Sequence, residues 1–144
     1  MLYEITAILV LMAQFTEEML EEMKATGIIS FATASKDGTP NVVPVGMIFM
    51  GDDGNIWLVD NYLNKTLANL KENPKAAFYV WNRDFKESYQ IKGTVTIENT
   101  GSDYLKAVSI AHAKKETYPA KNLIKMKVEE VYYVTPGDHA GQKL

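Results

Sequence analysis

The sequence predicts an α+β fold, mainly β, in which six antiparallel strands form a closed or nearly closed barrel flanked by helices. Six segments have the two-residue alternation or the β-branched composition of strands. Turns containing Asp-Gly join the first three segments closely. Segments with helical periodicity are inserted before and between the strands, and this mixture favours helices that cover a barrel.

The first element is expected to be an amphipathic helix that covers one end of the barrel. Phe15, Met19 and Met23 recur at helical spacing, with glutamates on the opposite face. Thr16 is suited to cap the start of this helix, and Gly27 is suited to end it.

The strands follow in order, and the first three should form an antiparallel meander. Strands are expected at 28–35, 40–50, 55–60, 76–81, 88–98 and 122–135, with helices at about 65–72 and 102–115. Within the last strand, Lys125 and Lys127 are expected on a solvated face. The Gly-rich tail after Pro136 is expected to be frayed.

The composition excludes several classes of function. The chain has no cysteine, so disulfides, thiolate catalysis and cysteine-ligated metal centres are excluded. A net charge of −3 argues against a general nucleic-acid binder, which needs a surplus of lysine and arginine. Because Arg83 is the only arginine, an anion site must rely on lysine, hydroxyls and backbone N–H groups. His112 and His139 show no spacing that favours a metal site, and none is predicted.

At 144 residues the chain is predicted to form one domain over 15–144, preceded by an N-terminal extension at 1–14. The apolar run from Ala7 to Ala13 is shorter than the ~20 residues of a membrane helix and lacks the basic flank of a signal peptide. Residues 1–11 are either an upstream extension, since Met12 begins a stretch that reads like a natural start, or a segment that packs on a partner. We therefore expect a cytoplasmic protein that does not bind membranes.

The turn before the helix at 65–72 is a candidate anion site. Asn64 is suited to the N-cap position, and the first N–H groups of a helix can hold a phosphate. Lys65 adds a positive charge and Thr66 a hydroxyl donor. These residues are equally compatible with a plain capped helix that carries an exposed lysine.

Three features, in this order along roughly residues 15–135, resemble the pyridoxamine 5'-phosphate oxidase-like FMN-binding split-barrel family. The first is the Asp37-Gly38-Thr39-Pro40 hairpin leading into a strand that contains Pro44. The second is the turn from Asn61 to Thr66. The third is the link Glu72-Asn73-Pro74-Lys75-Ala76-Ala77 into the fourth strand.

The resemblance implies a six-stranded split barrel, a homodimer, and one FMN in each of two grooves at the subunit interface. Lys65 and Thr66 would hold the phosphate, and the strand at 43–45 would lie along the ring system. Trp81, Asn82 or Tyr89 would reach the cofactor from the partner subunit. The implied cofactor-binding residues are Val43, Pro44, Val45, Asp60, Asn61, Asn64, Lys65, Thr66, Trp81 and Lys92.

The tail from Pro136 to Leu144 departs from the family's vitamin-processing enzymes, because it lacks their arginine- and histidine-bearing segment for the substrate phosphate. The resemblance is therefore to the shorter members, and true pyridoxamine 5'-phosphate oxidase activity is not expected. The principal hypothesis is a flavin-dependent oxidoreductase acting on an unidentified small molecule. The alternatives are a non-catalytic flavin or electron carrier, and a related split barrel that uses a deazaflavin coenzyme or haem.

Overall fold

The computed structural model describes residues 14–144, so the predicted extension lies outside the described residues apart from Gln14. The helices are α2 (Glu17–Thr26), α3 (Lys65–Glu72) and α4 (Ser102–Lys114). The strands are β1 (Ile29–Ala34), β2 (Pro40–Val45), β3 (Ile48–Met50), β4 (Ile56–Asp60), β5 (Lys75–Val80), β6 (Tyr89–Glu98) and β7 (Asn122–Tyr133). No helix in this part of the chain is both long and apolar enough to cross a membrane.

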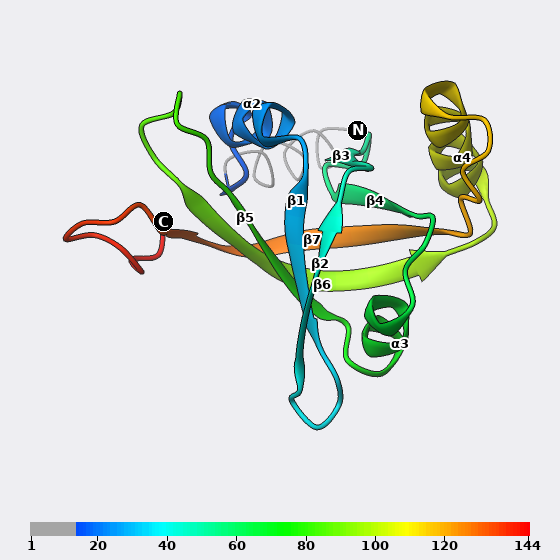
Figure 1. The fold of residues 1–144 in the computed structure, drawn as a ribbon, viewed down its shortest axis with the longest axis horizontal. Coiled ribbons are helices and arrows are strands. Elements are labelled where there is room, and N and C mark those ends of the chain that lie inside the picture. Colours follow the sequence, from blue (N-terminus) through cyan, green and yellow to red (C-terminus); the bar gives the residue numbers. More distant parts are fainter. Residues whose placement is uncertain (1–13) are drawn as a thin grey trace, which may run out of the picture.

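The strands form one curled antiparallel sheet in the order β2-β1-β5-β6-β7-β4-β3 (Figure 1). The mainly β architecture with flanking helices was predicted correctly, but the count of six strands was wrong. The expected strand at 40–50 is two strands, because β2 pairs with β1 whereas β3 pairs with β4. Only Gly46 and Met47 separate β2 from β3, so the chain itself links the two edges of the sheet.

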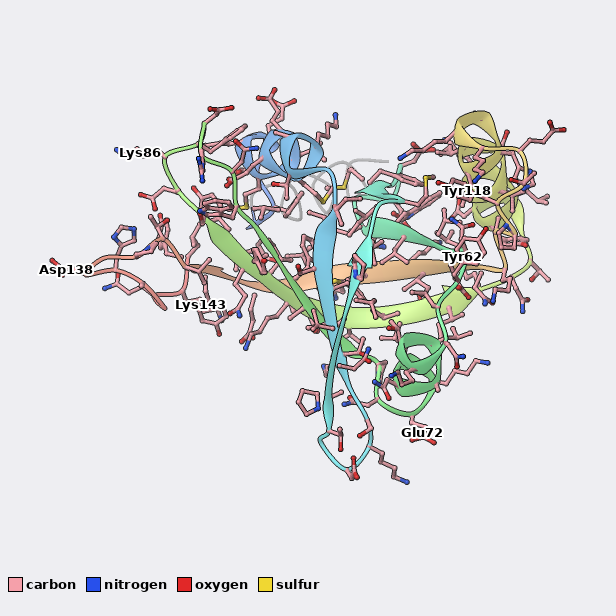
Figure 2. All side chains as sticks on the ribbon, viewed as in Figure 1. Tyr62, Glu72, Lys86, Tyr118, Asp138 and Lys143 are labelled. Atoms are coloured by element: carbon pink, nitrogen blue, oxygen red, sulfur yellow. The ribbon has the colours of Figure 1, made fainter. Side chains whose placement is uncertain are left out.

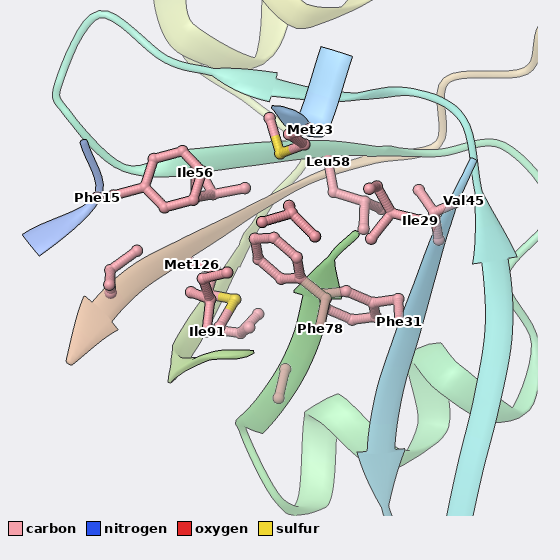
Figure 3. Packing of buried hydrophobic residues seen from close by; sticks show 14 of the residues in the cluster. Phe15, Met23, Ile29, Phe31, Val45, Ile56, Leu58, Phe78, Ile91 and Met126 are labelled. Carbon is pink, nitrogen blue, oxygen red and sulfur yellow. The ribbon is translucent and has the colours of Figure 1, made fainter. Parts of the chain in front are cut away.

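The main core lies inside the curl of the sheet (Figure 3) and is closed at one end by α2 (Figure 1). The Thr16 side chain accepts a hydrogen bond from the Met19 amide at the start of α2, and Gly27 ends the helix with φ +76°. Met19 and Met23 are buried against aromatic side chains from β1 and β5, including Phe31 and Phe78. The predicted amphipathic helix and both of its ends are confirmed.

A second, smaller core packs α4 against the outer face of β4. Trp57 and Val59 point toward α4, while Ile56 and Leu58 point into the main core, so β4 is buried on both faces. The buried face of α4 consists of the small residues Ala107 and Ala111, which allow close approach of helix and sheet. This packing brings the C-terminal end of α4 close to the link between β2 and β3.

The prediction of a frayed tail was wrong. The Tyr133 amide donates to the Gln142 carbonyl and the Leu144 amide donates to the Val131 carbonyl, each at 2.9 Å. β4 pairs with β7 only from Asn122 to Met126, so the same edge of β7 is free farther along, and the tail folds back to cover it. The His139 imidazole also lies 3.0 Å from the Glu87 carboxylate.

The prediction of a solvated Lys125 was also wrong. Its side chain is only 13% exposed and contacts the carboxylates of Glu98 at 2.7 Å, Asp103 at 2.6 Å and Asp53 at 3.5 Å. Burial lowers the pKa of Lys125, but the Asp103 and Glu98 carboxylates outweigh burial and raise it. Alternation along a strand assigns a face, but whether a neighbouring helix or turn covers that face depends on tertiary structure.

Candidate functional site

An open groove of about 530 Å³ runs along β2 and ends at the start of α3. Its other wall is formed by the loop between β4 and α3 and by the end of α4, where Tyr62 and Tyr118 lie between the two helices (Figure 2). Seven predicted site residues line it: Val43, Pro44, Val45, Asn61, Asn64, Lys65 and Thr66. The structure thus brings together two segments that are separated by β3 and β4 in the chain.

The start of α3 forms one end of the groove. The helix begins at Lys65, as predicted, but Asn64 forms no side-chain capping hydrogen bond. Its φ of −126° and ψ of −84° differ from the extended backbone conformation that a capping side chain requires. The Asn64 side chain therefore accepts no hydrogen bond from the first-turn N–H groups, and these groups remain suited to binding an anion.

The hydroxyl of Thr66 is held in place by a polar network beneath the groove. The Asn41 side-chain amide donates to Thr66 Oγ1 at 3.0 Å and to Thr33 Oγ1 at 3.3 Å. Asn69 from α3 donates to the same Thr33 hydroxyl at 3.1 Å. Because Thr66 Oγ1 accepts from Asn41, its own proton is free to be donated elsewhere.

Asn41 was not among the predicted site residues, although its position carried a signal. It alternates with Val43 and Val45 on the same face of β2, where a polar side chain is unusual unless it has a partner. Sequence alone did not reveal that partner, because Thr66 is 25 residues away.

Asp60 does not line the groove but shapes the loop that does. Its side chain is fully buried, and its two carboxylate oxygens accept from the Leu63 amide at 3.0 Å and from the Asn122 side chain at 2.8 Å. The neighbouring Asn61 accepts from the Ala120 amide at 3.0 Å. These bonds fix the turn from β4 into α3 and thereby position Lys65.

Replacing Asp60 by asparagine is expected to lower the free energy of unfolding by about 1–3 kcal/mol, because the new amide cannot accept from both donors and leaves one buried group unpaired. Chemical denaturation of Asp60→Asn and of a control, Asp138→Asn in the exposed part of the tail, measures this loss. Equal stability of the Asp60 variant and the wild type would contradict the assignment.

Two predicted residues lie away from this groove within the same chain. Trp81 is 51% exposed just after β5, and Lys92 lines a different hollow of about 740 Å³ on the outer face of the sheet. Asn82 follows Trp81, and Tyr89 is buried beside Tyr133. A single chain therefore does not bring these residues to Lys65.

Several other groove residues were missed by the sequence analysis, including two from the C-terminal half of the chain. Lys114 and Tyr118 come from the end of α4 and the loop after it. The Tyr118 carbonyl lies 2.9 Å from the His112 imidazole, and the Lys115 ammonium lies over the Tyr118 ring. Lysines at a helix end look solvated in sequence, and only the packing of α4 on β4 places Lys114 at the groove.

Comparison with known proteins identifies the family. The sequence profile of pyridoxamine 5'-phosphate oxidase matches residues 15–135, which include every strand and helix described above. The chain belongs to the pyridoxamine 5'-phosphate oxidase-like family. An uncharacterized protein of Methanocaldococcus jannaschii is 38% identical over 133 residues, covering 90% of this chain and 87% of that protein.

Several solved structures share the fold. HupZ of Group A Streptococcus is 25% identical with a TM-score of 0.74, over 88% of this chain and 98% of that one. An FMN-binding protein from Syntrophomonas wolfei is 19% identical with a TM-score of 0.69, over 92% and 95%. HutZ, a heme storage protein from Vibrio cholerae, is 12% identical with a TM-score of 0.62, over 78% and 89%. Proteins that share this fold therefore include one described as FMN-binding and one described as a heme storage protein.

Proposed function

We propose that this protein binds FMN in the groove between β2 and α3 and acts as an FMN-dependent oxidoreductase on a small molecule. The observation that supports this most directly is the convergence of Lys65, Thr66 and the first turn of α3 at one end of a groove whose β2 wall is apolar. The FMN-binding relative from Syntrophomonas wolfei supports the choice of cofactor.

The residues at the α3 end fit a phosphate monoester. Lys65 supplies a positive charge, Thr66 an O–H donor directed by Asn41, and the helix start its N–H groups. Charge-assisted hydrogen bonds of this kind compensate for the scarcity of arginine in the chain.

The rest of the groove fits a flat ring system. Val43, Pro44 and Val45 form an apolar wall on β2, which is an edge strand and so has backbone groups without a strand partner on its outer side. Pro44 has no N–H to donate. The backbone N–H of Val45 or Gly46 would therefore donate to the edge of the ring. When bound, FMN supplies reversible hydride transfer, and the protein needs only to hold it and admit a donor and an acceptor.

The homodimer remains part of the proposal, and an exposed apolar face supports it. Ile28, Val42, Tyr79 and Trp81 are 62%, 64%, 47% and 51% exposed around β1, β2 and β5. Large exposed side chains grouped in this way are typical of interaction surfaces. Trp81 and Lys92, which lie outside this chain's own groove, would then belong to the groove of the partner subunit.

A haem-binding function is the second candidate, supported by the heme storage protein among the structural relatives. The groove itself favours FMN, because none of the lining residues that the structure describes is a histidine, the usual proximal ligand of haem iron. The absorption spectrum of the purified protein separates a flavin from a Soret-absorbing porphyrin and from a deazaflavin.

Replacing both Lys65 and Thr66 by alanine is expected to weaken FMN binding by at least about a hundredfold, since two hydrogen bonds to a charged group are lost and each contributes roughly 1.5–3 kcal/mol. Fluorescence titration of apoprotein with FMN measures the affinity. Lys71→Ala, on the last turn of the same helix and outside the groove, is the matched control. Unchanged affinity in the double variant would place the phosphate elsewhere.

Catalytic turnover distinguishes an oxidoreductase from a non-catalytic flavin carrier. Bleaching of the bound flavin by NADH or NADPH, followed by repeated reoxidation with an acceptor, is expected of an oxidoreductase. A flavin-loaded protein that is inert to every hydride donor would instead be a carrier. A colourless protein that takes up no FMN would exclude both flavin functions.

A further inference from the structure

The groove carries two lysines on different helices and no carboxylate. Lys65 comes from the start of α3 and Lys114 from the end of α4, and no aspartate or glutamate is among the described residues that line it. The whole chain has a net charge of −3, so the positive charge of this groove is local rather than general. A groove lined by one sign of charge favours an anionic ligand.

The two lysines lie at opposite ends of the groove. Thr66, next to Lys65, bonds to Asn41 near the start of β2. Lys114 lies three residues after Ala111, which packs with Met47, just beyond the far end of β2, and with Val59 of β4. Val43, Pro44 and Val45 lie between these two ends.

The proposed FMN site determines which part of the cofactor lies near each lysine. A phosphate held at Lys65 leaves the ribityl chain and the ring system to extend along β2, toward Gly46 and Met47. The ring end of the groove is then the end that Lys114 and Tyr118 close. Lys114 is therefore not needed for the phosphate, and its charge acts on the ring system.

Resting on the proposed function, we infer that Lys114 is a positioning residue that sets the reduction potential of the bound flavin. The ring system gains negative charge on reduction, whereas the phosphate charge is the same in both forms. A cation beside the ring stabilises the reduced form more than the oxidised form and so raises the potential. Lys65, beside the phosphate, stabilises both forms alike.

The test compares affinities of the full-length protein for oxidised FMN and, under anaerobic conditions, for reduced FMN. Lys114→Gln is expected to weaken the binding of reduced FMN three- to tenfold more than that of oxidised FMN. A tenfold change in this ratio corresponds to a fall of about 30 mV in the two-electron midpoint potential. Lys114→Arg, which keeps the charge, should restore the wild-type ratio.

Two further variants isolate the effect. Lys65→Gln should weaken both forms by the same factor and leave the potential unchanged. Lys121→Gln removes an exposed lysine close to the α4 loop but outside the groove, and should change neither affinity. If Lys114→Gln leaves the ratio of the affinities for reduced and oxidised FMN unchanged, whether or not both affinities fall, the inference is overturned while the proposed FMN binding stands. Failure of the wild type to bind oxidised FMN would instead overturn the proposed function.

Discussion

Replacing Gly93 by alanine is expected to destabilise the protein by about 3 kcal/mol or more, the largest loss among the substitutions considered. Gly93 lies in β6 at a β-bulge, where the register with β7 shifts between Lys92 and Gly93. A Cβ at this position would overlap the carbonyl oxygen of Lys127 and lie 2.9 Å from its carbonyl carbon. Both atoms belong to the backbone of the neighbouring strand, so no side-chain rotation relieves the overlap.

Thermal or urea unfolding of Gly93→Ala measures the loss. Gly46→Ala is the control, because a Cβ there meets only the Ile28 side chain at 3.4 Å and the backbone conformation is ordinary. A Gly93 variant as stable as this control would show that β6 and β7 separate at the bulge at little cost. If Gly93→Ala does not fold, its destabilisation is read from the fraction of soluble protein relative to the Gly46→Ala control.

Replacing Glu22 by glutamine is expected to stabilise the protein at alkaline pH. Glu22 is on α2 and is fully buried, and neither carboxylate oxygen has a hydrogen-bond partner among the described residues. Burial raises the pKa of Glu22 from 4.5 to about 7; the Asn82 backbone amide opposes this rise, and the charge of Glu18 adds to it. The folded protein therefore favours the protonated acid.

The direction of the pH dependence follows from this shift. The pKa in the folded state lies above that in the unfolded state, so the wild type loses stability as the pH rises from about 4.5 through about 7. Each unit of pKa difference corresponds to about 1.4 kcal/mol, and because part of the loss occurs below pH 5, the loss between pH 5 and pH 8 is about 2.5 kcal/mol. Glutamine cannot ionise, and the variant should keep this stability.

Urea unfolding of the two proteins at pH 5 and pH 8 tests the expectation. The wild type and Glu22→Gln should be nearly equal in stability at pH 5 and differ by about 2.5 kcal/mol at pH 8. Glu21→Gln, one residue earlier on the exposed face of α2, is the control and should follow the wild type at both values. A parallel pH dependence of Glu22→Gln and the wild type would show that Glu22 is not the responsible group.

The candidate site was predictable where local chemistry decides it. The start of α3 at Lys65, the hairpin before β2 and the extended strand through Pro44 follow from helical periodicity, turn residues and strand alternation, although Asn64 does not cap α3 with its side chain. The order of these motifs along the chain then indicated the family, which the match over 15–135 confirms. These features depend on residues within a few positions of one another.

The rest of the site depends on contacts between distant segments. Sequence reasoning did not find Lys114 or Tyr118, which join the groove only through the packing of α4. It also missed Asn41, which lies beneath the groove and meets Thr66 only through the packing of α3 on β2. Sequence reasoning also named Asp60 as a cofactor-binding residue, whereas the buried carboxylate of Asp60 fixes the β4–α3 turn.

The sequence by itself therefore determined the helices, the strands apart from the division of the segment at 40–50, the family, and the residues at the α3 end of the groove, since helix starts, hairpins and strand alternation are set by neighbouring residues. Only the tertiary structure decided that the strand at 40–50 divides at Gly46, that Lys125 is buried among carboxylates, and that a second lysine closes the groove. The physical reason is that strand partners, burial and the field at a site are set by groups far away in the chain, whose approach the curled sheet determines.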